Sequence, residues 1–200
     1  ADDAGTFTGT DNGAPLNTLI SSITEGVVFI PPAPDGKGYF ASTLVTLKSN
    51  LRVISENALV YNDATSVGVG NFLFYGNDID NVTIKGLRVI AKSDATAWPA
   101  NINPERAVSL RGVIREVHLE DLDLKDHQNF AIGYGNSADT TTADYINGLH
   151  FKNIKIHGET ADTSNGSGID LFPYETSANP TSRNVFLNVM NIDVSRGEAS

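Results

Sequence analysis

Carboxylates with titratable neighbours are the residues of this chain best suited to chemistry. Asp170 lies between Ile169 and Leu171, and an aspartate inside such an apolar alternation is predicted to point outward from the middle of a strand. Asp126 and His127 place an acid beside a base that titrates near neutral pH. These residue types indicate general acid–base catalysis, with Asp170 as the acid or the base.

Cleavage of a glycosidic bond is the chemistry that such groups could perform. Hydrolysis commonly needs two carboxyls about 5–9.5 Å apart, whereas elimination needs one base and a group that neutralises a uronate carboxylate. Glu175, in the insertion 173–180, is a further catalytic candidate that could reach a groove lined by Asp170. Structural roles compete with these assignments, since Asp170 could be a solvated surface residue and Asp126 a turn residue that hydrogen-bonds its own backbone.

Three residues are candidates for binding a sugar polymer. Trp98 lies in the polar insertion 95–104, and flat aromatic rings stack on pyranose rings. Arg111 is predicted to lie two strands away from Asp170 on the same outward face, where it could hold a uronate or sulfate group. Tyr134 is the third candidate, although its inward phase also fits a core position.

The composition excludes several classes of protein. The 200 residues carry 14 Lys and Arg against 24 Asp and Glu, a net charge of −10, whereas nucleic acids and anionic lipid surfaces attract basic proteins. Without cysteine there is no disulfide framework, thiolate metal site or cysteine nucleophile. An apolar share of 40% is typical of a globular domain, and no apolar run reaches the ~20 residues of a membrane span. We therefore expect neither a nucleic-acid partner nor a membrane partner.

One helix and a series of short strands are predicted to position these residues. Apolar side chains at 16, 19, 20 and 23 share one helical face, which predicts a helix over 15–25. From residue 39 onward, an apolar-x-apolar pattern returns at intervals of roughly 31 to 36 residues. Its copies are 51–53, 82–84, 117–119, 149–151 and 185–187. Repeats of several short strands without intervening helices are typical of a parallel β-solenoid, with a β-sandwich as the alternative.

Aligning these repeats places charges of opposite sign over one another. The two outward columns are Lys85, Glu120 and Lys152, and beside them Arg88, Asp123 and Lys155. Opposite charges on neighbouring strands attract each other, so we interpret both columns as structural ladders rather than as a binding face.

Two further outward columns bear on ligand binding. The column of Asp170 contains Gly133 and Ser109, whose small side chains predict a concavity where a sugar ring could approach. The other column consists of Thr83, His118, His150 and Phe186. Stacked histidines are able to bind a metal ion, but no carboxylate joins them in this alignment, so we expect no metal site and no cofactor.

The first third of the chain resembles the opening of a known class of β-helix. Residues 10–61 contain G-T-D-N-G-A-P-L-N-T-L-I-S-S-I, then G-V-V-F-I-P-P, then S-T-L-V-T-L-K-S-N-L-R-V-I-S-E-N. This order of loop, helix, strand and first coil is similar to that of pectate-lyase-like β-helix proteins, among them bacteriophage tailspikes and capsule depolymerases. The resemblance implies a right-handed parallel β-helix that acts on an extracellular polysaccharide and, as in tailspikes, assembles into a homotrimer.

The stretch that begins at Asn165 carries a narrower resemblance. Its N-G-S-G-I-D-L, followed after a spacer by R-N-V-F-L-N, is similar to the N-T-D-G-I-D … N-V-x-I-x-N stretch of polygalacturonase-type glycoside hydrolases. Asp170 matches the second aspartate of that motif, while Ser167 stands where those enzymes carry the first. The resemblance implies that the chain handles glycans. Calcium-dependent pectate lyases match less well, because the histidine column offers no carboxylate cluster for a hard cation.

We therefore predict an all-β protein, a right-handed parallel β-helix with a lead-in and capping helix in residues 1–26 and the solenoid in residues 27–200. Its predicted function is to bind and cleave an extracellular polysaccharide, as a phage tailspike depolymerase or a fragment of one. A structural or adhesive β-helix segment without catalysis stays open as an alternative, and so does a secreted bacterial polysaccharide lyase or epimerase. The repeat pattern ends incomplete, so we expect further chain or a partner at that edge, in a homotrimer located on a virion tail or outside the cell.

Overall fold

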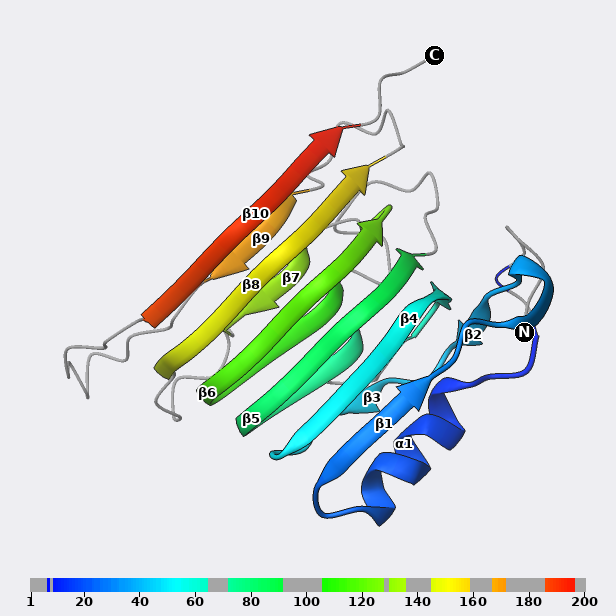
Figure 1. Cartoon of the computed structure of the whole chain (residues 1–200), viewed down its shortest axis with the longest axis horizontal. Coiled ribbons are helices and arrows are strands. Elements are labelled where there is room, and N and C mark those ends of the chain that lie inside the picture. Colours follow the sequence, from blue (N-terminus) through cyan, green and yellow to red (C-terminus); the bar gives the residue numbers. More distant parts are fainter. Residues whose placement is uncertain are drawn as a thin grey trace.

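A computed structural model describes residues 7, 9–64, 72–91, 106–127, 130–135, 145–158, 167–171 and 186–196 of the chain. Within these ranges the chain forms strands stacked side by side, with one α-helix at the N-terminal end (Figure 1). The elements are α1 (Gly13–Ser22), β1 (Gly26–Ile30), the 3-10 helix η1 (Pro34–Gly36), β2 (Tyr39–Ala41), β3 (Val45–Thr46), β4 (Leu51–Asn62), β5 (Phe72–Ala91), β6 (Arg106–Lys125), β7 (Phe130–Tyr134), β8 (Tyr145–Gly158), β9 (Ser167–Leu171) and β10 (Phe186–Arg196). None of the helices in the described ranges is long and apolar enough to cross a membrane.

The described strands pair in parallel throughout, which excludes the β-sandwich alternative. β1, β4, β5, β6, β8 and β10 follow one another along one face, where each pass of the chain lies on the previous pass (Figure 1). β6 also pairs with β7, and β7 with β9, so that these strands form a second face. The strands do not close into a barrel. The predicted parallel, repeating all-β architecture is therefore confirmed.

The register agrees with the sequence repeats until the last one. Val82 pairs with Val117, and Val117 with Leu149, as the alignment predicts. In the last pass, however, Leu187 takes the place opposite Leu149, two residues later than predicted, and an irregularity in the pairing precedes it. A shift of two residues keeps Leu187 in the inward alternation, so the apolar pattern of this segment does not detect the shift. Met190, which the repeat aligns with Ile154, instead pairs with Lys152 and is 55% exposed.

The core lies inside the coil and consists of alternate residues from each strand. One inward column contains Val53, Ile84, Leu119 and Phe151, each at most 2% exposed. Fully burying a side chain of this size contributes roughly 1.5–3 kcal/mol. Because such columns continue through successive passes, the coils stack into one continuous core.

Left-handed residues bend the strands of the first face within each pass of the chain. Asp121, Asn153 and Asn191 have φ values of 52°, 54° and 56°, in a region that Asn and Asp tolerate better than most residues. They also hydrogen-bond along the stack: Asn153 Nδ2 donates to Asp121 Oδ1 at 2.7 Å, and Asn191 Nδ2 donates to Asn153 Oδ1 at 3.1 Å. The recurrent Asn and Asp of the sequence therefore position the bends of successive coils.

Helix α1 covers the N-terminal end of the coil and begins and ends earlier than the predicted range 15–25. Its start is held by Asp11, whose carboxylate accepts hydrogen bonds from the backbone N–H of Gly13 at 2.9 Å and of Ser42 at 2.8 Å. Its last turn is held by Lys48, whose ammonium donates to the carbonyl oxygen of Ser21 at 2.8 Å. These contacts join the helix to the first coil, and the apolar pattern does not encode them.

Candidate functional site

The strand register predicted around Asp170 is present on the second face of the coil, but the column is covered, because Ser109 is 0% exposed and Gly133 is buried. Tyr75 pairs with Ser109, Ser109 with Gly133, and Gly133 with Asp170, on β5, β6, β7 and β9. The residues on both sides of Asp170, Ile169 and Leu171, pack against the core. Position 170 therefore stands in register with two small residues, as the sequence predicts, while the side chain of Asp170 lies outside the described part of the structure.

The predicted concavity in this column is filled by an arginine. A Cβ atom added to Gly133 would lie 2.5 Å from Nη1 and 2.7 Å from Cζ of Arg106. The guanidinium of Arg106 therefore covers Gly133, one strand away from Asp170. This finding corrects the prediction of an open hollow and places a permanent positive charge where the hollow was expected.

Aromatic rings and a second arginine extend the same region. The rings of Phe72 and Tyr75 stack at 6.3 Å with an interplanar angle of 19°. The guanidinium of Arg106 lies over the Phe72 ring at 5.6 Å, and that of Arg111 lies over the Tyr75 ring at 5.6 Å. Cation–π stacking holds each guanidinium plane against its aromatic ring. We call Phe72, Tyr75, Arg106 and Arg111, with the column of Asp170, the arginine–aromatic face.

Tyr134 and His127 do not belong to an accessible surface. Tyr134 is 1% exposed and its hydroxyl donates a hydrogen bond to the carbonyl oxygen of Gly112 at 2.8 Å. His127 is 7% exposed, and burial lowers its pKa to about 3. The imidazole therefore stays neutral and out of reach of a polymer. Both observations correct the sequence interpretation: Tyr134 is a core residue rather than a sugar-binding one, and His127 is buried rather than poised for catalysis.

Asp126 lies just after a strand, in a left-handed backbone conformation. Its φ is 61°, in the left-handed region, and its backbone N–H donates to the carbonyl oxygen of His157 at 2.9 Å. It directly follows the end of β6 at Lys125, outside the segments that pair with β7 and β9. Two other predicted site residues, Trp98 and Glu175, lie outside the described residues.

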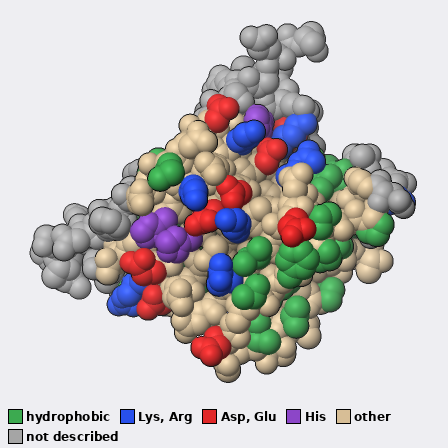
Figure 2. Space-filling view, viewed as in Figure 1, with side chains coloured by type: hydrophobic (Ala, Val, Ile, Leu, Met, Phe, Trp, Pro, Cys, Tyr) green, Lys and Arg blue, Asp and Glu red, His purple; other side chains and the backbone are tan. Residues whose placement is uncertain are grey.

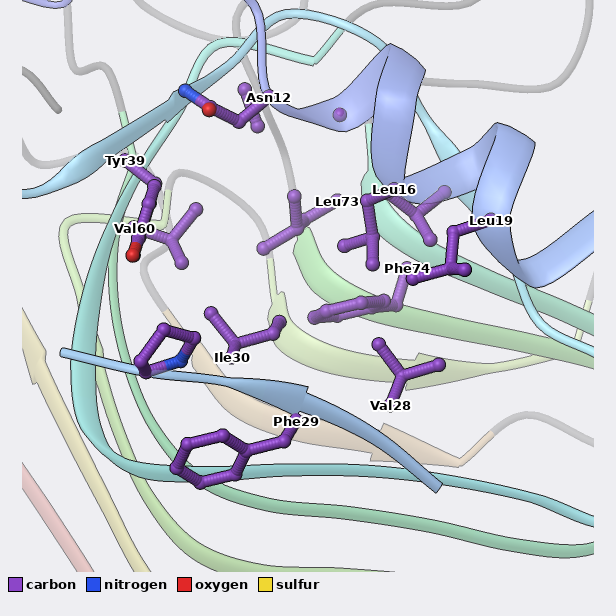
Figure 3. Close-up of a pocket in the computed structure, with 14 residues that line it drawn as sticks. Asn12, Leu16, Leu19, Val28, Phe29, Ile30, Tyr39, Val60, Leu73 and Phe74 are labelled. Atoms are coloured by element: carbon purple, nitrogen blue, oxygen red, sulfur yellow. The ribbon is translucent and has the colours of Figure 1, made fainter. Parts of the chain in front are cut away.

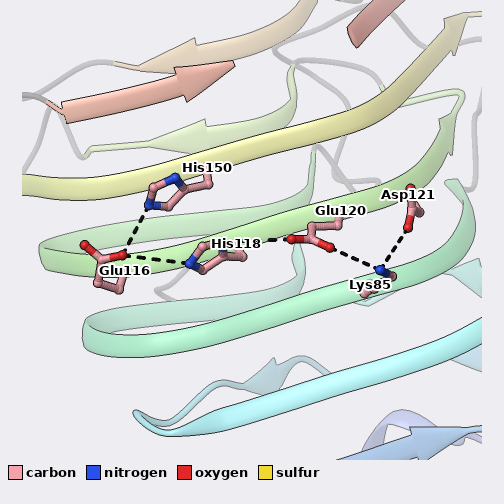
Figure 4. A network of polar contacts seen from close by, with 6 residues as sticks. All are labelled: Lys85, Glu116, His118, Glu120, Asp121 and His150. Atoms are coloured by element: carbon pink, nitrogen blue, oxygen red, sulfur yellow. Dashed lines mark hydrogen bonds and ion pairs between the residues drawn. The ribbon is translucent and has the colours of Figure 1, made fainter. Parts of the chain in front are cut away.

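A second cluster of titratable side chains lies on the first face, across β6 and β8 (Figure 4). His118 and His150 are opposite each other in the register, and their rings stack at 4.2 Å with an interplanar angle of 6°. Oε2 of Glu116 lies 3.3 Å from Nε2 of His150 and 3.9 Å from Nε2 of His118. A carboxylate thus joins the stacked histidines, which corrects the expectation that none does. The fourth member of the column is Asn188 and not Phe186.

Charged residues next to this cluster form the predicted ladder. Nζ of Lys85 lies 3.2 Å from Oε2 of Glu120 and 3.3 Å from Oδ2 of Asp121. The hydrogen bonds that the Lys85 ammonium donates to Glu120 and Asp121 raise the pKa of Lys85. The other Glu120 oxygen, Oε1, lies 3.9 Å from Nδ1 of His118, whose pKa is lowered by burial and then by the nearby His150. Figure 2 shows basic, acidic and histidine side chains gathered on one face of the molecule. The register places Lys85 opposite Glu120 and Arg88 opposite Asp123, which confirms the inter-strand ladder.

A cavity of about 190 Å³ lies between α1, β1 and the first coil (Figure 3). Leu16, Leu19, Val28, Leu73 and Phe74 are among the apolar side chains around it. Sugar sites need converging polar groups, which this lining does not provide. The cavity is therefore a gap in the packing under the helix and not a candidate for glycan chemistry.

Comparison with known proteins gives one informative result. No protein-family model matches the chain, and no curated protein sequence matches it. Among solved structures, the chain resembles a "putative glycosyl hydrolase" from Parabacteroides merdae, with a TM-score of 0.51 and 16% sequence identity. The match covers 96% of this chain and 91% of that protein. At this level of identity the likeness concerns the fold, which the two chains share over nearly their whole lengths.

Proposed function

We propose that this protein binds and cleaves an anionic extracellular polysaccharide on its arginine–aromatic face. The observation that carries the proposal is the pair of arginines, Arg106 and Arg111, each stacked on an aromatic ring beside the column of Asp170. In a chain of net charge −10, a general attraction for polyanions is absent, so recognition of a uronate has to be local. Two oriented guanidinium groups supply that local charge.

The proposed roles follow from the chemistry of each group. A guanidinium forms paired hydrogen bonds with a carboxylate, so Arg106 and Arg111 hold the uronate groups of the polymer. Asp170 acts as the acid or base next to the bond that breaks. In elimination the base removes the proton on C5, a C4=C5 double bond forms as the C4–O bond breaks, and the leaving oxygen takes up a proton from water. Neutralisation of the uronate carboxylate by an arginine makes the C5 proton more acidic. Hydrolysis needs a second carboxyl besides Asp170, so that one acts as the acid and the other as the base or nucleophile. Glu175 is the candidate for this second carboxyl.

The wider proposal follows the resemblance of residues 10–61. We propose that the coil is a right-handed parallel β-helix, the hand that nearly all parallel crossovers adopt. A tailspike-type depolymerase, trimeric and located on a virion tail or outside the cell, is the architecture that this resemblance supports. Light scattering of the purified chain tests the trimer, because a stable monodisperse monomer would contradict it.

Incubation with a polysaccharide panel tests the proposed function. The panel contains a polyuronate, a sulfated polymer and a neutral glucan, and each is followed by viscosity, reducing ends and ultraviolet absorbance. We expect loss of viscosity with the polyuronate and little change with the glucan. New absorbance together with new reducing ends identifies elimination, and reducing ends alone identify hydrolysis.

A pair of arginine variants locates the activity on the molecule. Arg106→Gln removes one cation from the arginine–aromatic face, whereas Arg52→Gln removes an exposed cation from β4, on the other face. We expect the first variant to lose at least about tenfold in polyuronate cleavage, the effect of one lost charge-assisted hydrogen bond. Arg52→Gln should behave as the wild type. Equal activities of the two variants would contradict the proposed site, and binding without cleavage would favour the adhesive alternative.

A further inference from the structure

We propose that Glu116, His118 and His150 form a binding site for a divalent transition-metal ion such as Zn²⁺. The three residues are the metal-ligating cluster of the first face, and their ligand atoms all lie within 4.8 Å of one another. This site lies on β6 and β8, is separate from the arginine–aromatic face, and does not depend on the proposed function.

The backbone of the coil explains why a glutamate reaches the histidines. Asn50, Asn81, Glu116 and Gly148 occupy the same bend in four successive passes, with φ values of 61°, 55°, 46° and 90°. In the first two passes, asparagine fills the bend, and Asn81 Nδ2 donates to Asn50 Oδ1 at 3.0 Å. The third pass has glutamate instead, a residue that gains nothing from a left-handed conformation. Its longer side chain extends to the next strand.

A glycine in the fourth pass makes room for that side chain. A Cβ atom added to Gly148 would lie 2.6 Å from Oε1 of Glu116. The carboxylate of Glu116 therefore lies directly over Gly148, two residues before His150 on the same strand. Glutamate in one pass and glycine in the next together direct a carboxylate at a pair of imidazoles.

The ligand atoms of the three residues lie close together. Nε2 of His150 and Nε2 of His118 face the same oxygen, Oε2 of Glu116, at 3.3 and 3.9 Å (Figure 4). Ligand atoms around a tetrahedral Zn²⁺ with bonds of about 2.0–2.1 Å lie roughly 3.3–3.5 Å apart. The carboxylate already meets this separation with His150. The two imidazole rings lie nearly parallel, at 6°, so their nitrogen lone pairs run side by side. Binding of one ion by both nitrogens therefore requires one ring to rotate out of the stack. Two nitrogens and one oxygen leave a fourth position for water.

The donor atoms select the class of metal. Imidazole nitrogen suits Zn²⁺, Cu²⁺, Ni²⁺ and Co²⁺, whereas Ca²⁺ and Mg²⁺ require six or more oxygen ligands or a largely hydrated shell. A second carboxylate lies behind His118: Oε1 of Glu120 is 3.9 Å from Nδ1 of His118, and Lys85 pairs with Glu120 at 3.2 Å. Such outer carboxylates commonly fix the orientation of a metal-binding imidazole.

Titration of the metal-free, tag-free chain tests the site. Zn²⁺ binding is measured by calorimetry, and Co²⁺ is used as a coloured probe whose absorption reports four-coordination. We expect one ion per chain with micromolar or tighter affinity, and an upward shift of the melting temperature with Zn²⁺. Ca²⁺ should not compete. Absence of stoichiometric Zn²⁺ binding in this titration overturns the proposal and leaves the cluster as an ion pair.

Matched variants identify the ligands. His150→Gln and Glu116→Gln should each weaken Zn²⁺ binding at least tenfold, and circular dichroism verifies that they are folded. His157→Gln is the control, because His157 also contacts a carboxylate, Asp123 at 3.3 Å, but belongs to no cluster of three ligands in the described ranges. If His150→Gln does not fold, His118→Gln replaces it. Equal binding by the wild type and the ligand variants overturns the assignment, and so does equal weakening by His157→Gln.

Discussion

Protonation of buried His127 should make the protein lose stability in mild acid. Neither ring nitrogen of His127 has a hydrogen-bond partner among the described residues, and burial lowers its pKa from 6.5 to about 3. The unfolded chain therefore binds a proton near pH 6.5, while the folded protein does not bind it until near pH 3. The free energy of unfolding is therefore unaffected by protonation of His127 above pH 6.5. It decreases as the pH falls from about 6.5 towards about 3, because only the unfolded chain binds the proton.

The size of the effect follows from linkage. One proton bound only by the unfolded state changes the free energy of unfolding by about 1.4 kcal/mol per pH unit. Between pH 6.5 and pH 5 the loss amounts to roughly 2 kcal/mol. For a chain of this length it corresponds to a fall in melting temperature of about 4–8 °C. Protonation of Asp11 changes the free energy of unfolding only below about pH 5, because the pKa of Asp11 is lowered from 3.8. Burial alone would raise this pKa, but hydrogen bonds from Thr43, Ser42, Gly13 and Ala14 outweigh the burial.

Urea unfolding at several pH values measures this loss. The variant His127→Leu removes the titrating group and keeps the site apolar, so its stability should fall by about 2 kcal/mol less than that of the wild type between pH 6.5 and pH 5. The variant should be at least as stable as the wild type at pH 7, since an imidazole buried without partners costs free energy. Comparison with the wild type also cancels the contribution of His118, whose pKa is lowered in the same direction. Parallel pH profiles of the two proteins would refute the reasoning.

Three further substitutions have defined outcomes. Asp11→Ala should lower the free energy of unfolding, measured in urea, by about 2–3 kcal/mol. The substitution removes the carboxylate that accepts hydrogen bonds from both Gly13 of α1 and Ser42 of the first coil. A loss below about 0.5 kcal/mol would contradict this role. Tyr134→Phe should cost about 1 kcal/mol by removing the hydrogen bond from the Tyr134 hydroxyl to the Gly112 carbonyl, with cleavage unchanged; loss of cleavage would indicate that Tyr134 contacts the substrate. Gly133→Ala should displace the flexible guanidinium of Arg106 and weaken polyuronate binding, with a stability change under about 1 kcal/mol; unchanged binding would exclude Arg106 from the site.

The repeating part of the fold could be predicted from sequence because its signal has a strict period. Apolar residues alternate within each strand, and the charges of Lys85 and Glu120 fell opposite each other without being used in the alignment. The last pass was misplaced because Val185-Phe186-Leu187 and Leu187-Asn188-Val189 fit the same alternation. A two-residue shift leaves the apolar alternation of this segment unchanged.

The side-chain contacts between passes could not be predicted in the same way. Glu116 is two residues away from His118 in sequence, but it meets His150 only because the bend is left-handed and the next pass has Gly148. A left-handed glutamate has no sequence signature, whereas Asn, Asp and Gly at the other bends do. The guanidinium of Arg106 over Gly133 likewise depends on a rotamer and on the stacking with Phe72.

Turnover by Asp170→Asn measures the central claim most directly. The substitution preserves the shape of the side chain and removes its ability to exchange a proton, and Asp193→Asn on the exposed face of β10 is the matched control. With a polyuronate that the wild type cleaves, the account predicts that Asp170→Asn loses at least about 100-fold in rate, the usual contribution of one general acid or base. Asp193→Asn should retain full activity. Retention of most of the turnover by Asp170→Asn would show that this aspartate is only a surface residue and would contradict the proposed site.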